Sequence, residues 1–180
     1  SRSPSFRRCT PAMPHSPKPM PALLALALLA VAGSTMARTT DRKQPMDIDA
    51  GHQVCTSGKV VTCTFTQKVT VTQGSLRIDA DNGVIVQADG KPSNAQFHGD
   101  VDLHQQMDDG SQLSARSANL DYDLRNDIIV LTGAVTVQQN RGTLSGERVS
   151  YNLKTGQIES GGSGRVKMRI IPKDAEPGSP

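Results

Sequence analysis

Residues 119–139 read NLDYDLRNDIIVLTGAVTVQQ, and along this stretch apolar residues alternate with polar ones. Alternation with a period of two places apolar side chains on one face of the chain and polar ones on the other, which is typical of half-buried β-strands. The polar break at residues 125–127 and the pair Thr132 and Gly133 predict two tight turns. We therefore expect three short strands here, with no room for a helix.

The same pattern recurs on both sides of this stretch. Residues 65–71, 97–103 and 131–137 each begin with a large apolar residue, continue with a polar one, and end with apolar residues two positions apart. The segment LDYDL at 120–124 is matched by VSYNL at 149–153, 29 residues later. A recurrence near 30 residues that is built from short strands predicts stacked hairpins of a repeated β-unit.

The N-terminal part carries the pattern of a secretory signal. Residues 1–12 precede the first methionine, and we expect them to form an unstructured upstream extension. From Met13 or Met20, a weakly basic lead with Lys18 is followed by the apolar run 22–32 and by small residues before Ala37. Eleven helical residues span only about 16 Å, too short to cross a bilayer. We expect residues 13–37 to be a signal peptide cleaved near Ala37, with a retained membrane anchor as the alternative.

Removal of this leader changes the sign of the net charge. The whole chain has 20 Lys and Arg, 17 Asp and Glu and a formal net charge of +3, but four of the basic residues precede Arg38. The mature chain then carries 16 basic and 17 acidic residues, a net charge of −1. No basic cluster in it resembles a nucleic-acid footprint, and its four aromatic residues are too few for a base-stacking platform. We expect no nucleic-acid partner.

The remaining chain divides simply. We expect residues 38–45 to be a flexible N-terminus, residues 46–171 to be one β-domain of roughly a dozen strands, and residues 172–180 to be a disordered tail, because Pro172 ends the last alternating strand. The apolar positions are nearly all aliphatic, with few large rings. This composition fits either an ordinary aliphatic core or a sandwich that closes poorly and leaves an apolar slot.

Cys55 and Cys63 are the only cysteines outside the leader. A hairpin that turns at residues 58–60 would place them directly opposite each other, at a Cα separation of about 4.5 to 5.5 Å that suits a disulfide. An exported chain folds in an oxidising compartment. We expect a structural disulfide, with two free thiols as the alternative, because the spacing fits neither a CxxC redox pair nor a metal site.

Paired carboxylates are the strongest argument for an enzyme. Asp100 with Asp102, and Asp121 with Asp123, are the residue types that act in glycoside hydrolysis. Each pair falls on the polar face of a predicted strand, where solvation explains it. The two readings differ in whether these carboxylates line the concave side of the fold.

The other candidate catalytic and ligand-binding residues lack the required spacing. His52, His98 and His104 fit neither a metal site nor a catalytic triad. The glycine-rich segment 161–165 lacks the Lys-Ser/Thr of a phosphate loop. We expect no catalytic residue, no metal site and no cofactor.

Four segments in a fixed order carry a family resemblance. They are QPMDI at 44–48, VTVTQG at 69–74, the segments YDL, VLTG and QQ within 122–139, and GERVSY at 146–151. On these segments the chain resembles the OstA-like family of lipopolysaccharide-transport proteins of Gram-negative bacteria, over about residues 46–171. It departs from the family at Gln67, where the repeat usually has glycine, and in the pair Cys55 and Cys63, which the family does not require.

The resemblance implies both a fold and a function. The fold is all-β, an elongated antiparallel β-jellyroll that is V-shaped and open-ended, with an apolar interior groove. The function is that of a non-catalytic periplasmic bridge that holds the acyl chains of lipopolysaccharide in this groove and passes the lipid from the inner to the outer membrane.

The implied partners are lipopolysaccharide, an inner-membrane protein of the LptC type, an outer-membrane translocon of the LptD type, and further copies of the chain stacked head to tail. Three other interpretations stay open. One is a related family component, either the inner-membrane-anchored partner or the N-terminal domain of the translocon. The others are a periplasmic carbohydrate-active enzyme and a structural β-solenoid with parallel strands.

Alternation assigns the candidate site residues. A carrier needs a dry slot, since each CH₂ of a lipid chain exposed to water costs about 0.8 kcal/mol. The candidate groove positions, each of which either lines the groove or packs in a core, are Met46, Ile48, Val69, Val71, Ile78, Val101, Leu103, Leu120, Tyr122, Leu124, Val135, Val137, Leu144, Val149, Tyr151 and Leu153. The candidate partner edges, which either dock a neighbour or are protected by charge, are Met46, Asp47, Ile48, Val166, Lys167, Met168, Arg169 and Ile170.

Overall fold

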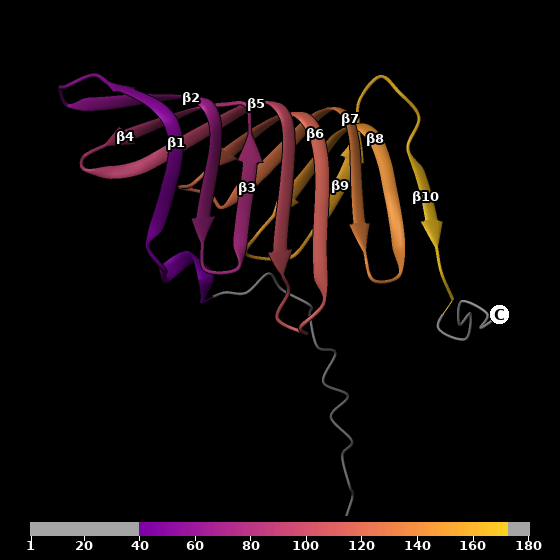
Figure 1. The fold of residues 1–180 in the computed structure, drawn as a ribbon. Coiled ribbons are helices and arrows are strands. Elements are labelled where there is room, and N and C mark those ends of the chain that lie inside the picture. The colour runs from indigo at the N-terminus through magenta and orange to yellow at the C-terminus, as the bar shows by residue number, and fades with distance from the viewer. Residues whose placement is uncertain (1–39, 173–180) are drawn as a thin grey trace, which may run out of the picture. The chain divides into compact units, whose positions relative to one another are not determined.

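A computed structural model describes residues 40–172 of the chain. It contains one short 3₁₀ helix, η1 (Asp41–Lys43), and ten strands joined in one sheet (Figure 1). The strands are β1 (Met46–Cys55), β2 (Val60–Gln73), β3 (Leu76–Ala80), β4 (Asn82–Ala88), β5 (Lys91–Gln106), β6 (Gln112–Asp123), β7 (Ile128–Gln139), β8 (Gly142–Asn152), β9 (Ile158–Gly161) and β10 (Lys167–Ile170). The predicted extension 1–12, the signal peptide 13–37 and the tail beyond Pro172 lie outside the described residues.

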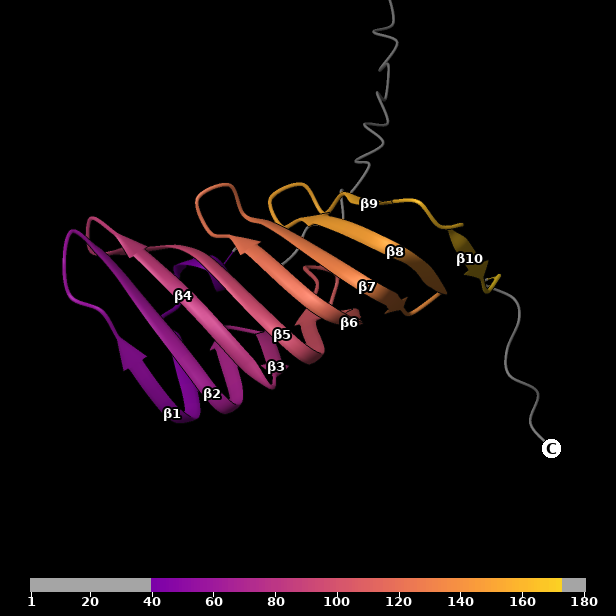
Figure 2. The same ribbon diagram turned by 90° about the horizontal axis from the view of Figure 1, so that it is seen from above.

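Every strand pairing in the described part of the chain is antiparallel. This pairing excludes a β-solenoid, whose coils are parallel. The strands follow one another almost in chain order, from β1 at one end to β10 at the other (Figure 2). No helix among residues 40–172 has the length and apolar character needed to cross a membrane.

The long strands are bent, so each contributes to two walls that face each other. The first wall consists of residues 46–50, 69–73, 76–80, 101–106, 112–117, 135–139, 142–146 and 167–170. The second wall consists of residues 52–55, 60–66, 82–88, 91–98, 119–123, 128–132, 148–152 and 158–161. Figure 1 shows the first wall in front, with its turns at the bottom of the view, and the second wall running behind it.

The bends come from pairs of residues with left-handed backbone. Such pairs lie within β2 at Gln67 and Lys68 (φ 65° and 69°), within β5 at residues 99–100 (78° and 42°), and within β7 at residues 133–134 (82° and 50°). The pairing register of neighbouring strands shifts at these positions. A β-bulge of this kind bends its strand, so the row of bulges forms the corner where the two walls meet. Gln67 adopts the backbone conformation that glycine has in the other repeats.

The bulges also explain one wrong prediction. The sequence predicts a turn at Thr132 and Gly133, but β7 runs without interruption from Ile128 to Gln139. The partners of β7 continue on both sides of the bulge. The quoted stretch therefore forms parts of two long strands in place of three short ones. The predicted count of about a dozen strands is too high for residues 40–172 for the same reason.

The predicted flexibility of the N-terminal segment 38–45 is wrong for residues 41–44. Asp41 is only 5% exposed, and it lies within η1. The Ser75 hydroxyl donates a hydrogen bond to the Asp41 carboxylate, and the Gln73 side-chain amide donates to the backbone oxygen of Gln44 at 3.1 Å. Contacts with the turn between β2 and β3, about 30 residues away, therefore hold this segment in place.

The space between the walls is an apolar core. Its largest fully buried side chains are Phe97, Ile78, Ile85, Leu103, Leu113, Leu120, Ile129, Leu153, Val69, Val101, Val135 and Val149. They come from both walls and from seven strands, which makes the core continuous along the molecule. Aliphatic residues dominate it, as the composition indicates.

Candidate functional site

The structure places the sixteen candidate groove residues in three environments. Twelve are buried between the walls, with exposed fractions of 4% or less. Met46, Leu124 and Leu144 are half-buried and pack against this core. Ile48, on the edge strand β1, is 38% exposed.

The interior is closed along its middle. The internal cavity lined by Leu103, Leu113, Val137 and Tyr151, among others, has a volume of about 10 Å³. This is room for about one water molecule. At this point the predicted apolar groove is therefore filled by side chains. Side chains from the facing walls interdigitate and fill the space, as they do in protein cores generally.

Three buried polar side chains, Ser93, Gln105 and Ser117, interrupt the apolar interior, and both serine hydroxyls donate hydrogen bonds to backbone oxygens. Gln105 lies on β5 between the inward-facing residues Leu103 and Met107, and it is 3% exposed. Its side-chain oxygen Oε1 is buried and has no hydrogen-bond partner. Alternation along β5 identifies this position as inward-facing, although Gln105 is not among the groove positions predicted from the sequence.

An open apolar pocket lies at the β10 end of the sheet. Its volume is about 530 Å³, in the range of sites that hold small apolar ligands. Its apolar lining comes from β7, β8, β9 and β10 and from the chain before β10: Val137, Leu144, Ile158, Val166, Met168 and Ile170. Alternation in the sequence predicts Val137 and Leu144 as groove positions and Val166, Met168 and Ile170 as an edge, and Ile158 belongs to neither predicted set.

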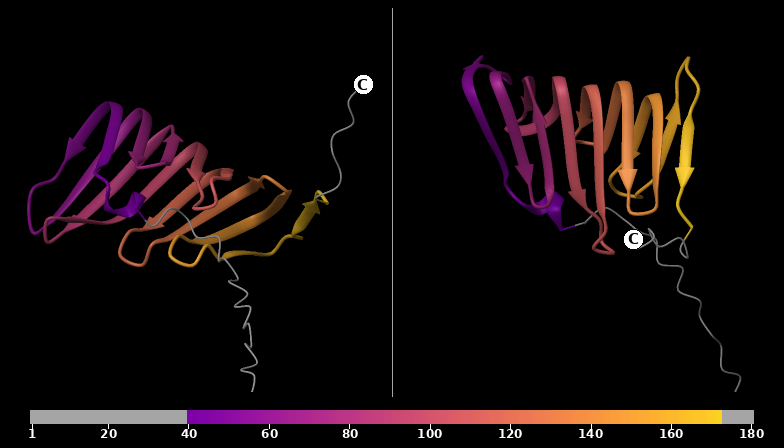
Figure 3. Two further views of the ribbon diagram at one scale, coloured as in Figure 1. Left: turned by 90° about the horizontal axis from the view of Figure 1, so that it is seen from below. Right: turned by 45° about the vertical axis from the view of Figure 1, so that its right-hand side comes forward.

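The two ends of the sheet have unpaired edges within the described residues. β1 pairs only with β2, and β10 pairs only with β8 through four residues (Figure 3). Large apolar side chains are exposed at both ends, with Val54 at 57% and Val60 at 53% near β1, and Met168 at 70% and Ile170 at 67% on β10. Exposed apolar side chains next to unpaired strand edges are typical of surfaces that pair with another chain.

The edge strands carry opposite charges on their outer faces. Asp47 and Asp49 lie opposite Thr72 and Thr70 of β2, on the face that points away from the core, and both are exposed. Lys167 and Arg169 lie opposite Ser145 and Thr143 of β8, on the corresponding face at the other end, and they are also exposed.

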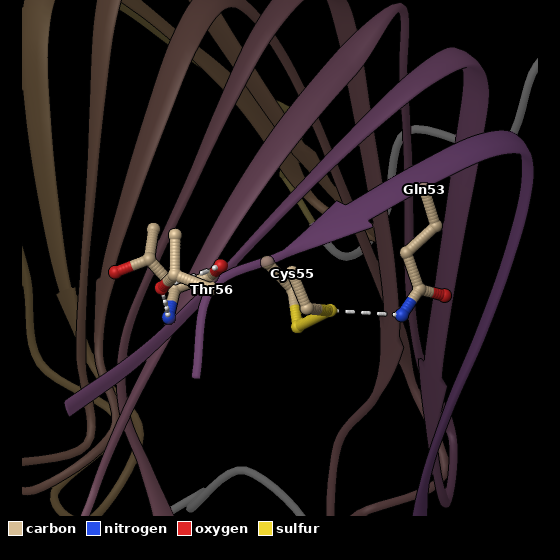
Figure 4. The surroundings of a disulfide bond; sticks show 5 residues. Gln53, Cys55 and Thr56 are labelled. Carbon is tan, nitrogen blue, oxygen red and sulfur yellow. Dashed lines mark hydrogen bonds between the residues drawn. A yellow bond between two sulfur atoms is a disulfide. The ribbon is translucent and has the colours of Figure 1, made fainter. Parts of the chain in front are cut away.

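The disulfide lies at the far end of the β1–β2 hairpin. Cys55 and Cys63 lie directly opposite each other with a Cα separation of 4.1 Å, and they form the bond that the sequence predicts. The Gln53 side-chain amide donates a hydrogen bond to the Cys55 sulfur at 3.0 Å (Figure 4). The backbone N–H of Thr56 donates to the Thr62 oxygen at 2.9 Å, which extends the pairing beyond the disulfide.

The free edges of the two walls touch on the open side of the V. Arg42, beside the first wall, forms an ion pair with Asp127 in the turn between β6 and β7 of the second wall, at 3.1 Å. Lys154 of the second wall contacts the same carboxylate at 3.4 Å. The Tyr151 hydroxyl of the second wall donates to the sulfur of Met107, at the edge of the first wall, at 3.5 Å.

Both buried tyrosines lie close to this contact. Burial raises the pKa of Tyr151 to about 12 and raises the pKa of Tyr122 well above its usual value. The negative charge of Asp127 adds to the shift at Tyr122, and the positive charge of Arg42 opposes the shift at both tyrosines. The two phenols therefore stay neutral at physiological pH and belong to the apolar interior.

The paired carboxylates lie on outer faces and not in the interior. Asp102 contacts the guanidinium of Arg116 at 3.1 Å, and Asp121 accepts a hydrogen bond from Gln96 at 2.8 Å. Asp123 accepts hydrogen bonds from the backbone of the turn that follows it. Among residues 40–172, no three His, Cys, Asp or Glu side chains are grouped as a metal site would require. Asp100 and Asp102 line, together with Arg116, a pocket of about 460 Å³ beside the bulges of the corner, separate from the apolar pocket at the β10 end.

Comparison with known proteins identifies the family. Residues 47–157 match the family described as "LptA/(LptD N-terminal domain) LPS transport protein". The lipopolysaccharide export system protein LptA of Haemophilus influenzae is 32% identical over 154 residues, which cover 83% of this chain and 89% of that protein. LptA of Escherichia coli is 30% identical over 160 residues, which cover 86% of this chain and 85% of that protein.

A solved structure has the same fold. LptH of Pseudomonas aeruginosa, described as the LptA-homologous periplasmic component of the lipopolysaccharide transport device, superposes with a TM-score of 0.65 at 22% identity. The match covers 73% of this chain and 99% of that one. These findings confirm the predicted β-jellyroll and the resemblance to the OstA-like proteins, and they place the chain among non-catalytic transport proteins. The chain belongs to the LptA/(LptD N-terminal domain) family of lipopolysaccharide transport proteins.

Proposed function

We propose that this chain is a periplasmic component of the lipopolysaccharide transport bridge, and that it holds the acyl chains of the lipid between its two walls. The observation that carries this proposal is the continuous apolar interior, which runs between the walls and leads to the open pocket beside β10. The relatives matched over most of their length are export proteins of the LptA type, which favours this role over that of the inner-membrane-anchored partner or the translocon.

The interior suits acyl chains on energetic grounds. Each CH₂ transferred from water to an apolar site contributes about 0.8 kcal/mol, so a long chain needs an apolar surface without buried charge. Charged side chains such as Asp102 and Asp121 lie on the outer faces, and the inward positions of both walls are almost all aliphatic or aromatic.

The closed interior is compatible with this role, because the two facing walls can move apart without loss of strand pairing. All strand pairing runs between neighbouring strands of one wall, and none joins the two facing walls. Only side-chain packing and the few contacts of the open side hold the walls together away from the corner. An acyl chain that enters replaces contacts between the walls with contacts of the same apolar kind. The backbone hydrogen bonds stay intact.

Head-to-tail stacking is the second part of the proposal. Along the first wall, the path from β1 to β10 crosses seven successive antiparallel pairings, so these two strands run in opposite directions. A second copy displaced along the molecule would therefore place its β1 antiparallel to β10 of the first, the pairing used throughout the sheet. Such a joint aligns Met168 and Ile170 with Met46 and Ile48, and the apolar interior continues from one copy to the next. Partners of the same fold in the inner and outer membranes would dock on the same edges.

Photo-crosslinking tests the lipid site. A photoreactive residue at Leu103, Tyr122 or Leu124 is expected to label lipopolysaccharide, because these side chains lie between the walls or at their margin. The same residue at Asp121, which lies on the opposite face of β6 from Leu120 and Tyr122, serves as the control. Equal labelling from Asp121 would remove the assignment of the lipid to the interior.

A further inference from the structure

The N-terminal strap, residues 40–44, is fixed to the first wall at one side of the open V. Asp41 is buried under the turn between β2 and β3, where it accepts a hydrogen bond from Ser75. The Gln73 side chain donates to the backbone oxygens of Arg42 at 3.4 Å and of Gln44 at 3.1 Å. Gly74 has φ +61°, and a Cβ there would lie 2.7 Å from the Cβ of Asp41. The first wall therefore has a turn shaped to hold the strap.

The other side of the strap reaches the second wall through Arg42. Its guanidinium contacts Asp127 at 3.1 Å, and the side chains are 23% and 17% exposed, so this ion pair is partly shielded from water. Among residues 40–172, it is the only ion pair that joins the free edges of the two walls. The backbone oxygen of Asp127 also accepts a hydrogen bond from the N–H of Leu153 at 2.9 Å. Asp127 is thus itself held in position on the second wall.

The strap crosses the open side of the V, the side of a stacked copy that still faces solvent. In a head-to-tail stack, neighbouring copies cover the β1 and β10 ends, and the corner side is closed by continuous strands. Besides the two ends, which lead into the interiors of the neighbouring copies, the interior can be reached from the open side of the V, where Arg42 meets Asp127 and Tyr151 meets Met107. The buried side chain of Tyr122 lies close to this contact, since the charges of Asp127 and Arg42 both act on its pKa.

We propose that the strap is a gate on the apolar interior, and that separation of Arg42 from Asp127 lets acyl chains enter sideways between the walls. The proposal of a gate rests on the proposed lipid-carrying function, and it adds a way in which entry of the lipid is regulated. An anionic lipid headgroup at the entrance offers Arg42 and Lys154 a replacement for the Asp127 carboxylate. The ligand therefore binds the open state more tightly than the closed state. A difference in affinity of this kind is required for a ligand to shift the equilibrium between two states.

A reversible lock across the entrance tests the gate. Arg42→Cys with Asp127→Cys, joined by a short bifunctional thiosulfonate that reducing agent cleaves, would tie the two walls together. Asp127→Cys with Lys154→Cys, joined by the same reagent, is the matched control, because both residues belong to the second wall. Lipopolysaccharide is added to each protein, and labelling is measured from a photoreactive residue at Leu103.

The gate predicts at least tenfold less labelling in the locked protein, recovery after reduction, and no change in the control pair. Equal labelling of locked and unlocked protein would overturn the gate while leaving the lipid site in place. An absence of labelling in the unlocked protein would remove both. Arg42→Ala is expected to label several-fold faster than the parent, and Lys43→Ala, an exposed neighbour in η1, is expected to label at the parent rate.

A different observation carries a second proposal. Gln105 points into the interior from β5, and its Oε1 has no hydrogen-bond partner. A buried carbonyl oxygen without a donor is unfavourable, and a hydroxyl or amide N–H on a bound acyl chain would supply that donor. We infer that Gln105 selects acyl chains that carry such a polar group near the first wall.

Competition with simple fatty acids tests this role. Displacement of a fluorescent fatty acid by 3-hydroxytetradecanoate and by tetradecanoate is compared in the parent protein and in Gln105→Met, which keeps the length of the side chain. The parent is expected to favour the hydroxylated acid several-fold, and the variant to bind both acids equally. A parent protein without this preference, or a variant that retains it, would overturn the assignment.

Discussion

At the scale of single residues, Gly74 and Asp41 form the least obvious contact of the fold. The turn between β2 and β3 needs a left-handed residue at position 74, and its glycine also leaves room for the Asp41 carboxyl group. The same φ region is found at Gly90, where a Cβ would meet nothing within 4 Å. The two glycines therefore separate the cost of backbone strain from the cost of displacing Asp41.

Gly74→Ala is expected to destabilise the protein more than Gly90→Ala. An alanine at position 90 lowers the unfolding free energy only through its left-handed backbone, by about 1 kcal/mol. At position 74 it also displaces Asp41 and breaks the hydrogen bond from Ser75, which adds about 1 to 3 kcal/mol. Urea denaturation of the two variants measures the difference in unfolding free energy. Equal losses in both variants would mean that the strap contributes nothing to stability.

The sequence predicts inward positions better than it predicts this contact. Alternation along residues 120–124 and 149–153 places Leu120, Tyr122, Val149 and Tyr151 on the inner face, because a strand's period is local. The burial of Asp41 depends on Gly74 and Ser75, more than 30 residues away, and no local pattern marks it. A charged residue before the first strand is usually solvated, which is why the sequence predicts flexibility there.

At the scale of the elements, β1 is an edge strand held by one neighbour. Its first half pairs with β2 in the first wall, and its second half, residues 52–55, pairs with β2 in the second wall. The disulfide between Cys55 and Cys63 closes the end of that second half. The bond therefore limits fraying where β1 would otherwise separate most easily.

Replacing both cysteines by serine is expected to loosen the second half of β1 selectively. The loop-entropy estimate for closing about nine residues gives a loss of at most about 2.6 kcal/mol in unfolding free energy. Amide hydrogen exchange of residues 52–55 should accelerate, while exchange in the central strand β6 follows only the change in global stability. Reduction of the parent protein should reproduce the effect. Unchanged exchange at residues 52–55 would show that pairing with β2 alone holds this edge.

The sequence predicts the repeated β-unit but not its bulges. The repeated segments 65–71, 97–103 and 131–137 all lie at the corner, and in each the middle residues are left-handed. Gly133 is equally compatible with a turn and with a bulge, since both use a residue with positive φ. Only the pairing of β7 with β6 and β8 on both sides decides between them.

At the scale of the whole molecule, the two ends of the sheet carry apolar residues on their inner faces and opposite charges on their outer faces. In a head-to-tail joint, apolar Met168 and Ile170 continue the inner face into Met46 and Ile48. On the outer face of the same joint, Lys167 and Arg169 come next to Asp47 and Asp49. A head-to-head joint would instead bring like charges together. Opposite charges on the two edges therefore favour one direction of assembly.

Charge reversal at the ends gives the sharpest test of assembly. Lys167→Glu with Arg169→Glu in one chain, or Asp47→Lys with Asp49→Lys in another, is expected to weaken self-association about tenfold, because two attractive cross-strand pairs become repulsive. An equimolar mixture of the two variants should associate again, since each reversed end then meets an opposite charge on the other chain. Sedimentation velocity at low salt measures both effects, and 1 M salt, where the Debye length is about 3 Å, should reduce them. If either variant alone associates as tightly as the parent, charge does not direct the joint, and the apolar residues and backbone pairing of β1 and β10 must set it by themselves.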